Sequence, residues 1–257
     1  MISIRNLSFS YGNLKVLKDI SLDLFYGEFV GVVGPNGSGK TTLLKCLCKL
    51  LKPLGAVYID GEEISRLDLN KLSRKISYLS PEVDSSMDEL TVFELVSSGR
   101  TPYMRGIWWE SRDDEKIILD SIKIVGLDNL VNRKLKNLSS GEKQMARVAR
   151  ALSQKTKILL IDEPTIHLDL KHQIEIMSIL KRMVYDGALI IAVFHDLNLA
   201  SAYVDKIIVL KRGEVVVLGK PADVLTEEIL REVYDINVKI LRVGEDNVYI
   251  VFPTILT

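Results

Sequence analysis

The sequence of 257 residues has very little cysteine, and the little it has is poorly placed for covalent or metal chemistry. Cys46 and Cys48 are two positions apart in an apolar stretch, so on a helix their side chains would point in different directions. This spacing argues against a disulfide between them and against a metal pair. It favours small core residues in a reducing compartment.

The sequence also lacks an excess of charge and a long apolar run. Lys plus Arg and Asp plus Glu both total 34, so nothing favours bulk binding to nucleic acid or to acidic membranes. No apolar run approaches the ~20 residues that span a bilayer, and the start of the sequence lacks the basic-then-apolar layout of a signal peptide. We therefore expect a soluble, cytoplasmic chain that binds no nucleic acid.

What the sequence does contain is 47% hydrophobic residues, enough for a folded core. Continuous apolar runs at 28–33, 157–161 and 188–194 predict strands buried on both faces. Residues 41–51 and 171–185 have the spacing of helices that bury one side. Strands and helices in this alternation predict an α/β fold with βαβ units and a mainly parallel sheet.

The remaining segments predict smaller elements around this sheet. Alternation at 2–9 and 20–24 predicts half-buried strands near the start of the chain. Residues 85–156 contain loops and amphipathic helices, which we interpret as a helical insertion. The end of the sequence predicts a β hairpin at 207–218, a short helix from Thr226, and two strands at about 238–243 and 248–252.

A glycine-rich loop follows the first buried strand and precedes a helix, which is the context of a phosphate-binding loop. Its glycines permit backbone angles that other residues avoid, and its amides turn inward around a phosphate. Lys40 would supply a cation to the β- and γ-phosphates, and Thr41 a hydroxyl to Mg²⁺. The alternative is a glycine-rich turn with an exposed lysine. The loop consists of Gly34, Pro35, Asn36, Gly37, Ser38, Gly39, Lys40 and Thr41.

Two carboxylates, Asp162 and Glu163, follow the buried strand at 157–161. Because successive side chains of a strand face opposite ways, the two can serve different partners. Asp162 suits Mg²⁺ held through its water shell, and Glu163 could polarise a water for attack on the γ-phosphate. The alternative is a pair of solvated carboxylates at the end of a strand.

A second small-residue segment, Leu138-Ser139-Ser140-Gly141-Glu142-Lys143-Gln144, lies directly before a helix-like run. With the loop at 34–41 and the acidic strand end, it resembles the motif set of the ATP-binding-cassette (ABC) ATPases, in which it would be the signature. Further matches in the expected order are Tyr11-Gly12 to the A-loop, Leu168-Asp169 to the D-loop and His195 to the switch histidine. The resemblance extends from about residue 2 to about residue 225.

This resemblance implies a P-loop NTPase with a RecA-like core, an antiparallel β subdomain and an inserted α-helical subdomain. The ABC ATPase domain would span 1–225, followed by a C-terminal extension at 226–257. Within it, the core with the β subdomain would occupy about 1–84 and 157–225, and the helical subdomain about 85–156. Two copies would pair head to tail around two ATP molecules, each between Lys40 of one copy and Ser139 and Gly141 of the other.

The resemblance also implies roles for individual residues. Glu163, His195 and Lys40 would be catalytic, and Thr41, Asp162 and Glu82 would hold Mg²⁺. Besides the loop at 34–41, nucleotide contacts are implied for Tyr11, Thr42, Ser139, Ser140, Gly141, Glu142 and Asp169.

Several of these residues have plainer interpretations. His195 could be a structural histidine, and Tyr11 an ordinary aromatic at the end of a strand. His167 and His172, which flank Asp169, are interpreted as surface or interface residues. The pair Trp108-Trp109 is interpreted as a packing or interface pair, because no basic run surrounds it.

Two places depart from the family pattern. No glutamine follows the short strand at 76–79, where the family has one that contacts Mg²⁺; Glu82 is the nearest candidate, and counting forward from Tyr78 would select Pro81. A carboxylate there would bind Mg²⁺ more tightly but would repel the triphosphate. In the signature, Ser140 stands at a common glycine position, which would cost about 1 kcal/mol if φ must be positive, and Glu142 replaces the commonest glutamine.

The expected function is that of the ATP-hydrolysing subunit of an ABC transporter, most like importers of iron–siderophore, haem or cobalamin type. The segments that resemble this type are 94–100, 165–170 and 219–225. The subunit would act at the cytoplasmic face of the cell membrane, docked through residues around 83–110 on separate transmembrane permease subunits, with a substrate-binding protein. The alternatives are a soluble ABC ATPase in cofactor assembly or another mechanical role, and a regulatory cassette without turnover.

Overall fold

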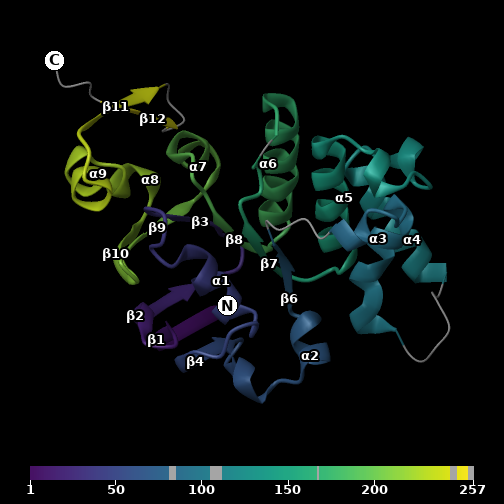
Figure 1. The fold of residues 1–257 in the computed structure, drawn as a ribbon, viewed down its shortest axis with the longest axis horizontal. Helices are drawn as coiled ribbons and strands as arrows, with labels where there is room; N and C mark the ends of the chain where they lie inside the picture. Colours follow the sequence, from purple (N-terminus) through teal and green to yellow (C-terminus); the bar gives the residue numbers. More distant parts are fainter. Residues whose placement is uncertain (81–84, 105–111, 167, 244–247, 254–257) are drawn as a thin grey trace. The chain divides into compact units, whose positions relative to one another are not determined.

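A computed structural model describes the chain except for residues 81–84, 105–111, 167, 244–247 and 254–257. The chain forms two compact units (Figure 1). The first unit comprises Met1–Leu67 with Leu189–Thr257, and the second comprises Asp68–Ala188. These units divide the chain at other residues than the subdomains expected from the sequence, and the subdomain division stays a prediction.

An antiparallel sheet opens the first unit. Its strands are β1 (Ile2–Tyr11), β2 (Leu14–Leu24), β4 (Leu54–Ile59) and β5 (Glu62–Glu63), in the order β2-β1-β4-β5. Ile2, Ile4 and Leu7 are fully buried while Arg5 and Asn6 are exposed, so the predicted half-buried strands are confirmed. β4 was not predicted, because its only strong apolar run is three residues long.

A second sheet of the first unit carries the glycine-rich loop. It contains β3 (Phe29–Val33), β8 (Leu189–Val193), β9 (Lys206–Lys211) and β10 (Glu214–Gly219). β3 pairs with β8 and with β9 in parallel, and β9 forms an antiparallel hairpin with β10. All residues of β3 and β8 are buried, as their continuous apolar runs predict.

Helix α1 (Lys40–Leu47) follows the loop and ends four residues earlier than the spacing predicts. Lys49 takes a positive φ of 62°, the Lys49 N–H bonds the Cys46 carbonyl, and the Leu50 N–H bonds the Lys45 carbonyl. These bonds form a Schellman motif, which closes a helix once one residue turns left-handed. Since Lys49 takes the place usually held by glycine, the sequence offered no stop signal.

The rest of the first unit is helical with a terminal hairpin. Both cysteine thiols are free, and burial raises the pKa of Cys46 to about 12 and that of Cys48 to about 11. The remaining elements are α7 (Leu197–Tyr203), α8 (Pro221–Val224), α9 (Glu227–Tyr234), β11 (Val238–Val243) and β12 (Val248–Pro253).

The second unit contains two parallel strands and several helices, which Figure 1 draws in blue, teal and green. The strands are β6 (Ile76–Leu79) and β7 (Ile158–Asp162), and β7 is fully buried. The helices are α2 (Leu69–Ser73), α3 (Val92–Ser97), α4 (Arg112–Ile124), α5 (Ser140–Ser153) and α6 (Leu170–Tyr185). Short 3₁₀ helices occur at Ile64–Arg66 in the first unit and at Ser85–Met87, Ser98–Tyr103, Asp128–Leu130 and Leu135–Asn137 in the second.

In the ranges that the structure describes, every helix is too short or too polar to cross a lipid bilayer.

Candidate functional site

The glycine-rich loop leaves the carboxyl end of β3 through backbone conformations that favour glycine. Gly34, Gly37 and Gly39 have φ values of 148°, 76° and 104°. A methyl group at Gly34 would lie 2.0 Å from the Leu210 carbonyl oxygen, so the loop passes directly over β9. The Gly213 N–H also bonds the Ser38 carbonyl at 3.1 Å. The neighbouring hairpin therefore holds the loop in a shape that only small residues can adopt.

The side chains of the loop turn inward as well. The ammonium group of Lys40 donates to the carbonyls of Gly34 and Pro35 at 2.8 and 3.0 Å, and the residue is 6% exposed. Ser38 Oγ is buried and has no hydrogen-bond partner among the residues that the structure describes. A buried hydroxyl, an ammonium group and backbone N–H groups that point inward are the hydrogen-bond donors that bind a polyphosphate.

Tyr11, the A-loop candidate, ends β1 in the same unit. Its side chain is 49% exposed, and its ring packs edge-to-face on Phe9 with the ring centroids 4.8 Å apart. Gly12 follows with a φ of 55° and turns the chain into β2. An exposed aromatic ring held by a second ring can offer a face to a base.

His195, the switch-histidine candidate, comes two residues after β8. The Phe194 N–H bonds the Val32 carbonyl at 3.0 Å, and β3 and β8 are parallel. His195 and Gly34 therefore leave the same edge of one sheet, at the carboxyl ends of adjacent strands. The next residue, Asp196, caps α7 by accepting bonds from the Asn198 and Leu199 amides, which fixes where His195 must leave the strand.

The C-terminal extension reaches the glycine-rich loop, which the sequence did not indicate. The Tyr234 side chain of α9 lies close to the Gly34 backbone, and burial raises the pKa of Tyr234 to about 12. Lys211 of β9 holds the end of the same helix through the Glu232 carbonyl and the Asp235 carboxylate. No motif pairs a distant tyrosine with a phosphate-binding loop, so only the fold could reveal this contact.

The acidic strand end lies in the second unit. Asp162 is the last residue of β7 and is 1% exposed, whereas Glu163 lies beyond the strand with a φ of 57°. Glu163 therefore does not take part in the alternation of strand side chains predicted for it, because the strand ends one residue earlier. A positive φ at a residue with a side chain costs about 1–3 kcal/mol.

The signature residues form the first turn of α5. Ser139 is the N-cap: its hydroxyl accepts a bond from the Glu142 N–H at 3.2 Å, and the Glu142 carboxylate accepts one from the Ser139 N–H at 2.7 Å. This is a capping box, and the bond from the Ser139 N–H lowers the pKa of Glu142. Glutamate is thus well suited to this position, and the Ser-x-x-Glu spacing could have indicated it.

Ser140 is the first helical residue of α5 and is not among the residues with positive φ. The cost that the sequence analysis attached to serine at this position therefore does not arise. Serine, like glycine, is acceptable in the first turn of a helix, because its backbone there is in the ordinary helical region.

Gln144 ties the signature helix to the connection between β7 and α6, and Asp169 caps α6. Gln144, which is 6% exposed, donates from Nε2 to the Pro164 carbonyl at 3.1 Å. Asp169, the D-loop candidate, caps α6 and accepts a bond from the His172 N–H at 2.9 Å. The sequence does not predict this contact of Gln144, because a lone glutamine in an amphipathic helix carries no signal of one.

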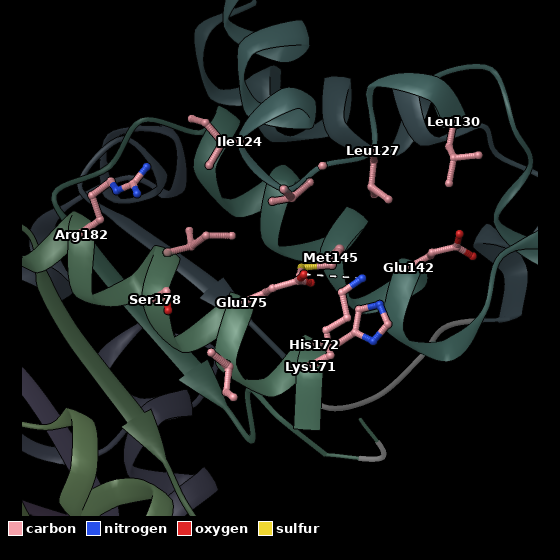
Figure 2. Close-up of a pocket in the computed structure, with 14 residues that line it drawn as sticks. Ile124, Leu127, Leu130, Glu142, Met145, Lys171, His172, Glu175, Ser178 and Arg182 are labelled. Atoms are coloured by element: carbon pink, nitrogen blue, oxygen red, sulfur yellow. Dashed lines mark ion pairs between the residues drawn. The ribbon is translucent and has the colours of Figure 1, made fainter. Parts of the chain in front are cut away.

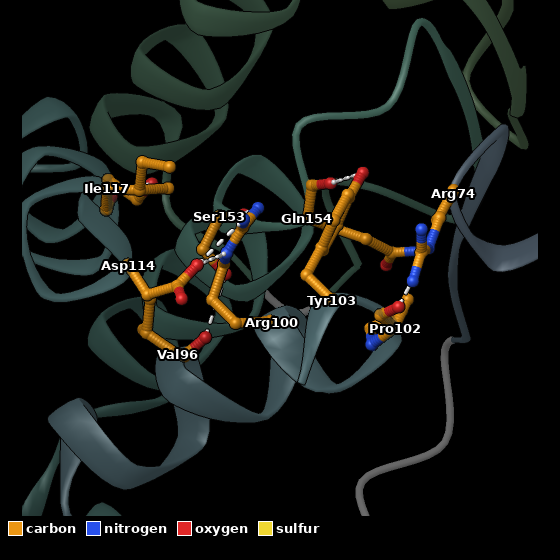
Figure 3. Close-up of polar contacts among 10 residues, drawn as sticks. Arg74, Val96, Arg100, Pro102, Tyr103, Asp114, Ile117, Ser153 and Gln154 are labelled. Carbon is orange, nitrogen blue, oxygen red and sulfur yellow. Dashed lines mark hydrogen bonds and ion pairs between the residues drawn. The ribbon is translucent and has the colours of Figure 1, made fainter. Parts of the chain in front are cut away.

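The segment expected to dock on a permease is described only at 85–104, and Glu82, Trp108 and Trp109 lie outside the described residues, as does His167. Figure 3 shows Tyr103 between two guanidinium groups, with that of Arg100 4.0 Å and that of Arg74 5.2 Å from the ring centroid. Arg100 is 7% exposed and pairs with Asp114 at 2.8 Å. Through these contacts the buried Arg100 ties the segment to α4 within the second unit.

The comparisons with known proteins agree with this geometry. A family model described as ABC transporter matches residues 17–166, more than half of the chain. The chain belongs to the ABC transporter ATP-binding family. The petrobactin import ATP-binding protein YclP of Bacillus subtilis (strain 168) is 37% identical over 254 residues, which are 98% of this chain and 100% of that protein. The ferric enterobactin transport ATP-binding protein FepC of Escherichia coli (strain K12) is 34% identical over 237 residues, covering 91% and 87%.

Solved cassettes have the same fold. The dimeric structure of a post-hydrolysis state of the ATP-binding cassette MJ0796 bound to ADP and Pi matches with a TM-score of 0.76 at 33% identity, covering 86% of this chain and 99% of that one. The predicted P-loop NTPase fold and ATPase activity are thereby confirmed. As an ABC ATPase, the chain binds nucleotide, and cassettes of this family act as dimers with transmembrane permease partners.

Proposed function

We propose that this chain is the ATP-hydrolysing subunit of an importer of iron–siderophore type, bound to separate permease subunits at the cytoplasmic face of the membrane. The relatives named above, whose names give petrobactin and ferric enterobactin as cargo, support the cargo class. A substrate-binding protein that delivers the cargo is part of the proposal. The cassette does not touch the cargo, so this assignment depends on relatives rather than on a pocket in the chain.

The glycine-rich loop supports the ATP site more strongly than any other feature. We infer that the β- and γ-phosphates lie in the ring of amides at 34–41, with Lys40 moving from the loop carbonyls to the phosphates. Both positions satisfy the ammonium group, so the exchange need not leave a buried charge unpaired. Tyr11 would stack on the adenine, and Thr42 would contact the nucleotide from the first turn of α1.

The signature turn, which we define as Ser139–Glu142, would contact the γ-phosphate of ATP held by a second copy. This proposed contact is supported by the N-terminus of α5, a 14-residue helix whose first amides carry partial positive charge. Head-to-tail pairing places one such turn over each loop of the partner. The dimer would therefore depend on ATP, because the phosphate links the two chains.

Mg²⁺ fits the residues proposed for it. The Thr41 hydroxyl and the Asp162 carboxylate are the hard oxygen donors that Mg²⁺ prefers, and Asp162 is 1% exposed at the end of a buried strand. Glu82 is proposed as a further ligand, although it lies outside the described residues. When bound, Mg²⁺ neutralises charge that develops on the phosphate oxygens.

Hydrolysis would depend on Glu163 as the general base. Its carboxylate would accept a proton from a water in line with the γ-phosphate, while His195 and Lys40 hold the phosphate oxygens. Asp169 would contact the nucleotide site of the second copy. The position of Glu163 directly after the buried strand β7, next to Asp162, supports this assignment.

Replacement of the proposed base tests this function. We expect Glu163→Gln to lower ATP turnover about 10²–10⁴-fold, and to accumulate an ATP-bound dimer that light scattering detects as a doubled mass. Glu214→Gln, an exposed glutamate of β10 paired with Lys18, is the matched control and should keep normal turnover. An unchanged rate in Glu163→Gln would overturn the assignment.

The assignment to a transporter is tested by identifying the proteins that co-purify with the tagged chain. We expect co-purification with a polytopic membrane protein after detergent extraction. Retention on ribosomes or DNA through a salt wash would instead favour the soluble mechanical role.

A further inference from the structure

His172 makes two bonds to the same carboxylate oxygen. Asp169 Oδ1 accepts from the His172 backbone N–H at 2.9 Å and contacts the ring Nδ1 at 2.8 Å. These two bonds lower the pKa of Asp169, so the carboxylate is ionised at neutral pH. Because an ionised carboxylate only accepts hydrogen bonds, Nδ1 must carry a proton. The ring is thereby fixed in orientation as well as in place.

The face of the same ring lies on the signature turn. A methyl group at Gly141 would be 2.8 Å from the ring atoms Cε1 and Nδ1 and 2.9 Å from Cγ. Three nearly equal distances mean that Gly141 faces the flat side of the imidazole rather than its edge. Glycine is therefore required at 141 by His172, whatever else the signature requires of it.

His172, in the first turn of α6, gives α5 a contact with the segment that follows β7, in addition to the contact that Gln144 makes. Gln144 holds the start of that connection at Pro164, and Gly141 holds its end through His172 and Asp169. Residues 141 and 144 are three apart and share one face of α5. The connection that begins with the proposed base is thus fixed to the signature helix at both ends.

Charged and apolar residues line the cavity beside the ring. His172 lines a cavity of about 520 Å³, shown in Figure 2, together with Glu142, Lys171 and Glu175. Lys171 pairs with Glu175 at 3.9 Å. None of these groups lies between the ring and Asp169, so the bond between them is direct.

We propose that His172 is a positioning residue that fixes Asp169 to the signature turn, so that both meet the second copy as one rigid surface. The inference rests on the proposed head-to-tail ATP dimer. Without the ring, Asp169 keeps only the backbone bond, and Gly141 loses the neighbour that fills its open side. The D-loop and the signature turn can then move independently, and dimer formation must order them.

The variants are compared in a Glu163→Gln background, where the ATP-bound dimer accumulates. Since one hydrogen bond is worth about fivefold in an equilibrium constant and the dimer contains two, His172→Ala should raise the dimer dissociation constant about 25-fold. Binding of ADP to the single chain, measured by calorimetry, should not change, because the glycine-rich loop belongs to the other unit. Lys171→Ala, whose side chain is 78% exposed on the same turn, should match the background.

Two amide variants separate positioning from general packing. Asn places an N–H near the position of Nδ1, whereas Gln places one near Nε2. His172→Asn should recover most of the dimer affinity and His172→Gln should not, although the two differ by one methylene. This pair decides the question even if His172→Ala folds poorly.

The possible results separate a failure of the proposed role of His172 from a failure of the proposed function on which that role depends. If Glu163→Gln alone forms no dimer with ATP, the proposed function fails. If it dimerises and His172→Ala dimerises equally well, or if the Asn and Gln variants behave alike, the role of His172 is overturned.

Discussion

The N-termini of α1 and α5 are the two helix ends proposed to meet phosphate, and they are constructed differently. α1 follows Gly39, whose φ is 104°, and has no side-chain cap. α5 follows Ser139 in an extended conformation and has a complete capping box with Glu142. One end is shaped by backbone angles and the other by side-chain hydrogen bonds.

This difference shows what each end can tolerate. The loop before α1 depends on glycine, because a side chain would strain its backbone or collide with a neighbouring strand. The turn before α5 accepts Ser140 and Glu142 in place of commoner residues, because its backbone is ordinary and its amides are held by side chains. The following substitutions should therefore damage the two ends by different mechanisms and to different extents.

The largest effect is expected for Gly34→Ala. Its methyl group would meet the Leu210 carbonyl oxygen at 2.0 Å in a strained backbone region, which should cost about 2–5 kcal/mol of unfolding free energy and abolish ADP binding. The matched control is Gly37→Ala, where φ is 76° but nothing lies within 4 Å of the added atom. That variant should lose only about 1–2 kcal/mol. Urea unfolding and ADP calorimetry measure both, and equal losses would contradict the collision.

A smaller effect is expected for Gly141→Ala. Alanine is favoured over glycine in a helix by about 1 kcal/mol, but here its methyl group displaces the His172 ring. We expect a net loss of stability and of ATP-dependent dimerisation. Adding His172→Ala should recover the stability but not the dimerisation, because it removes the collision and also the bond to Asp169. Additive effects in this double-mutant cycle would show that the two residues do not interact.

Removal of the α5 cap should be milder still. Ser139→Ala should cost about 1 kcal/mol in urea unfolding, with a further loss of ATP turnover because Ser139 faces the proposed phosphate. Thr91→Ala removes the equivalent capping box of α3 and provides the matched control. It should cost the same stability and leave turnover unchanged.

The smallest effect concerns pH. The pKa of Glu142 is lowered below its ordinary value of 4.5 by the bond from the Ser139 N–H. The folded state therefore gains stability from this group above pH 4.5, and loses it as the pH falls through the lowered pKa. Glu142→Gln keeps the capping geometry but cannot titrate. Its stability should vary less with pH below 4.5 than that of the unsubstituted chain, and identical pH profiles would contradict the prediction.

The sequence predicted those parts of the fold that depend on neighbours along the chain. The fully buried strands β3, β7 and β8 appear as apolar runs because both of their faces are covered. The glycine-rich loop could be recognised because its spacing alone specifies its backbone. The end of α1 could not be predicted from the sequence, because Lys49 adopts a left-handed conformation that is common in glycine and rare in lysine.

Only the folded structure decided how distant residues meet. The sequence placed Ser139, Gly141 and Asp169 in motifs, but it could not show that His172 joins two of those motifs or that Tyr234 reaches Gly34. Likewise, the positive φ of Glu163 and the ordinary helical backbone of Ser140 follow from where β7 ends and α5 begins. The physical reason is range: propensity and periodicity act over a few residues, whereas a side-chain contact depends on how the whole unit packs.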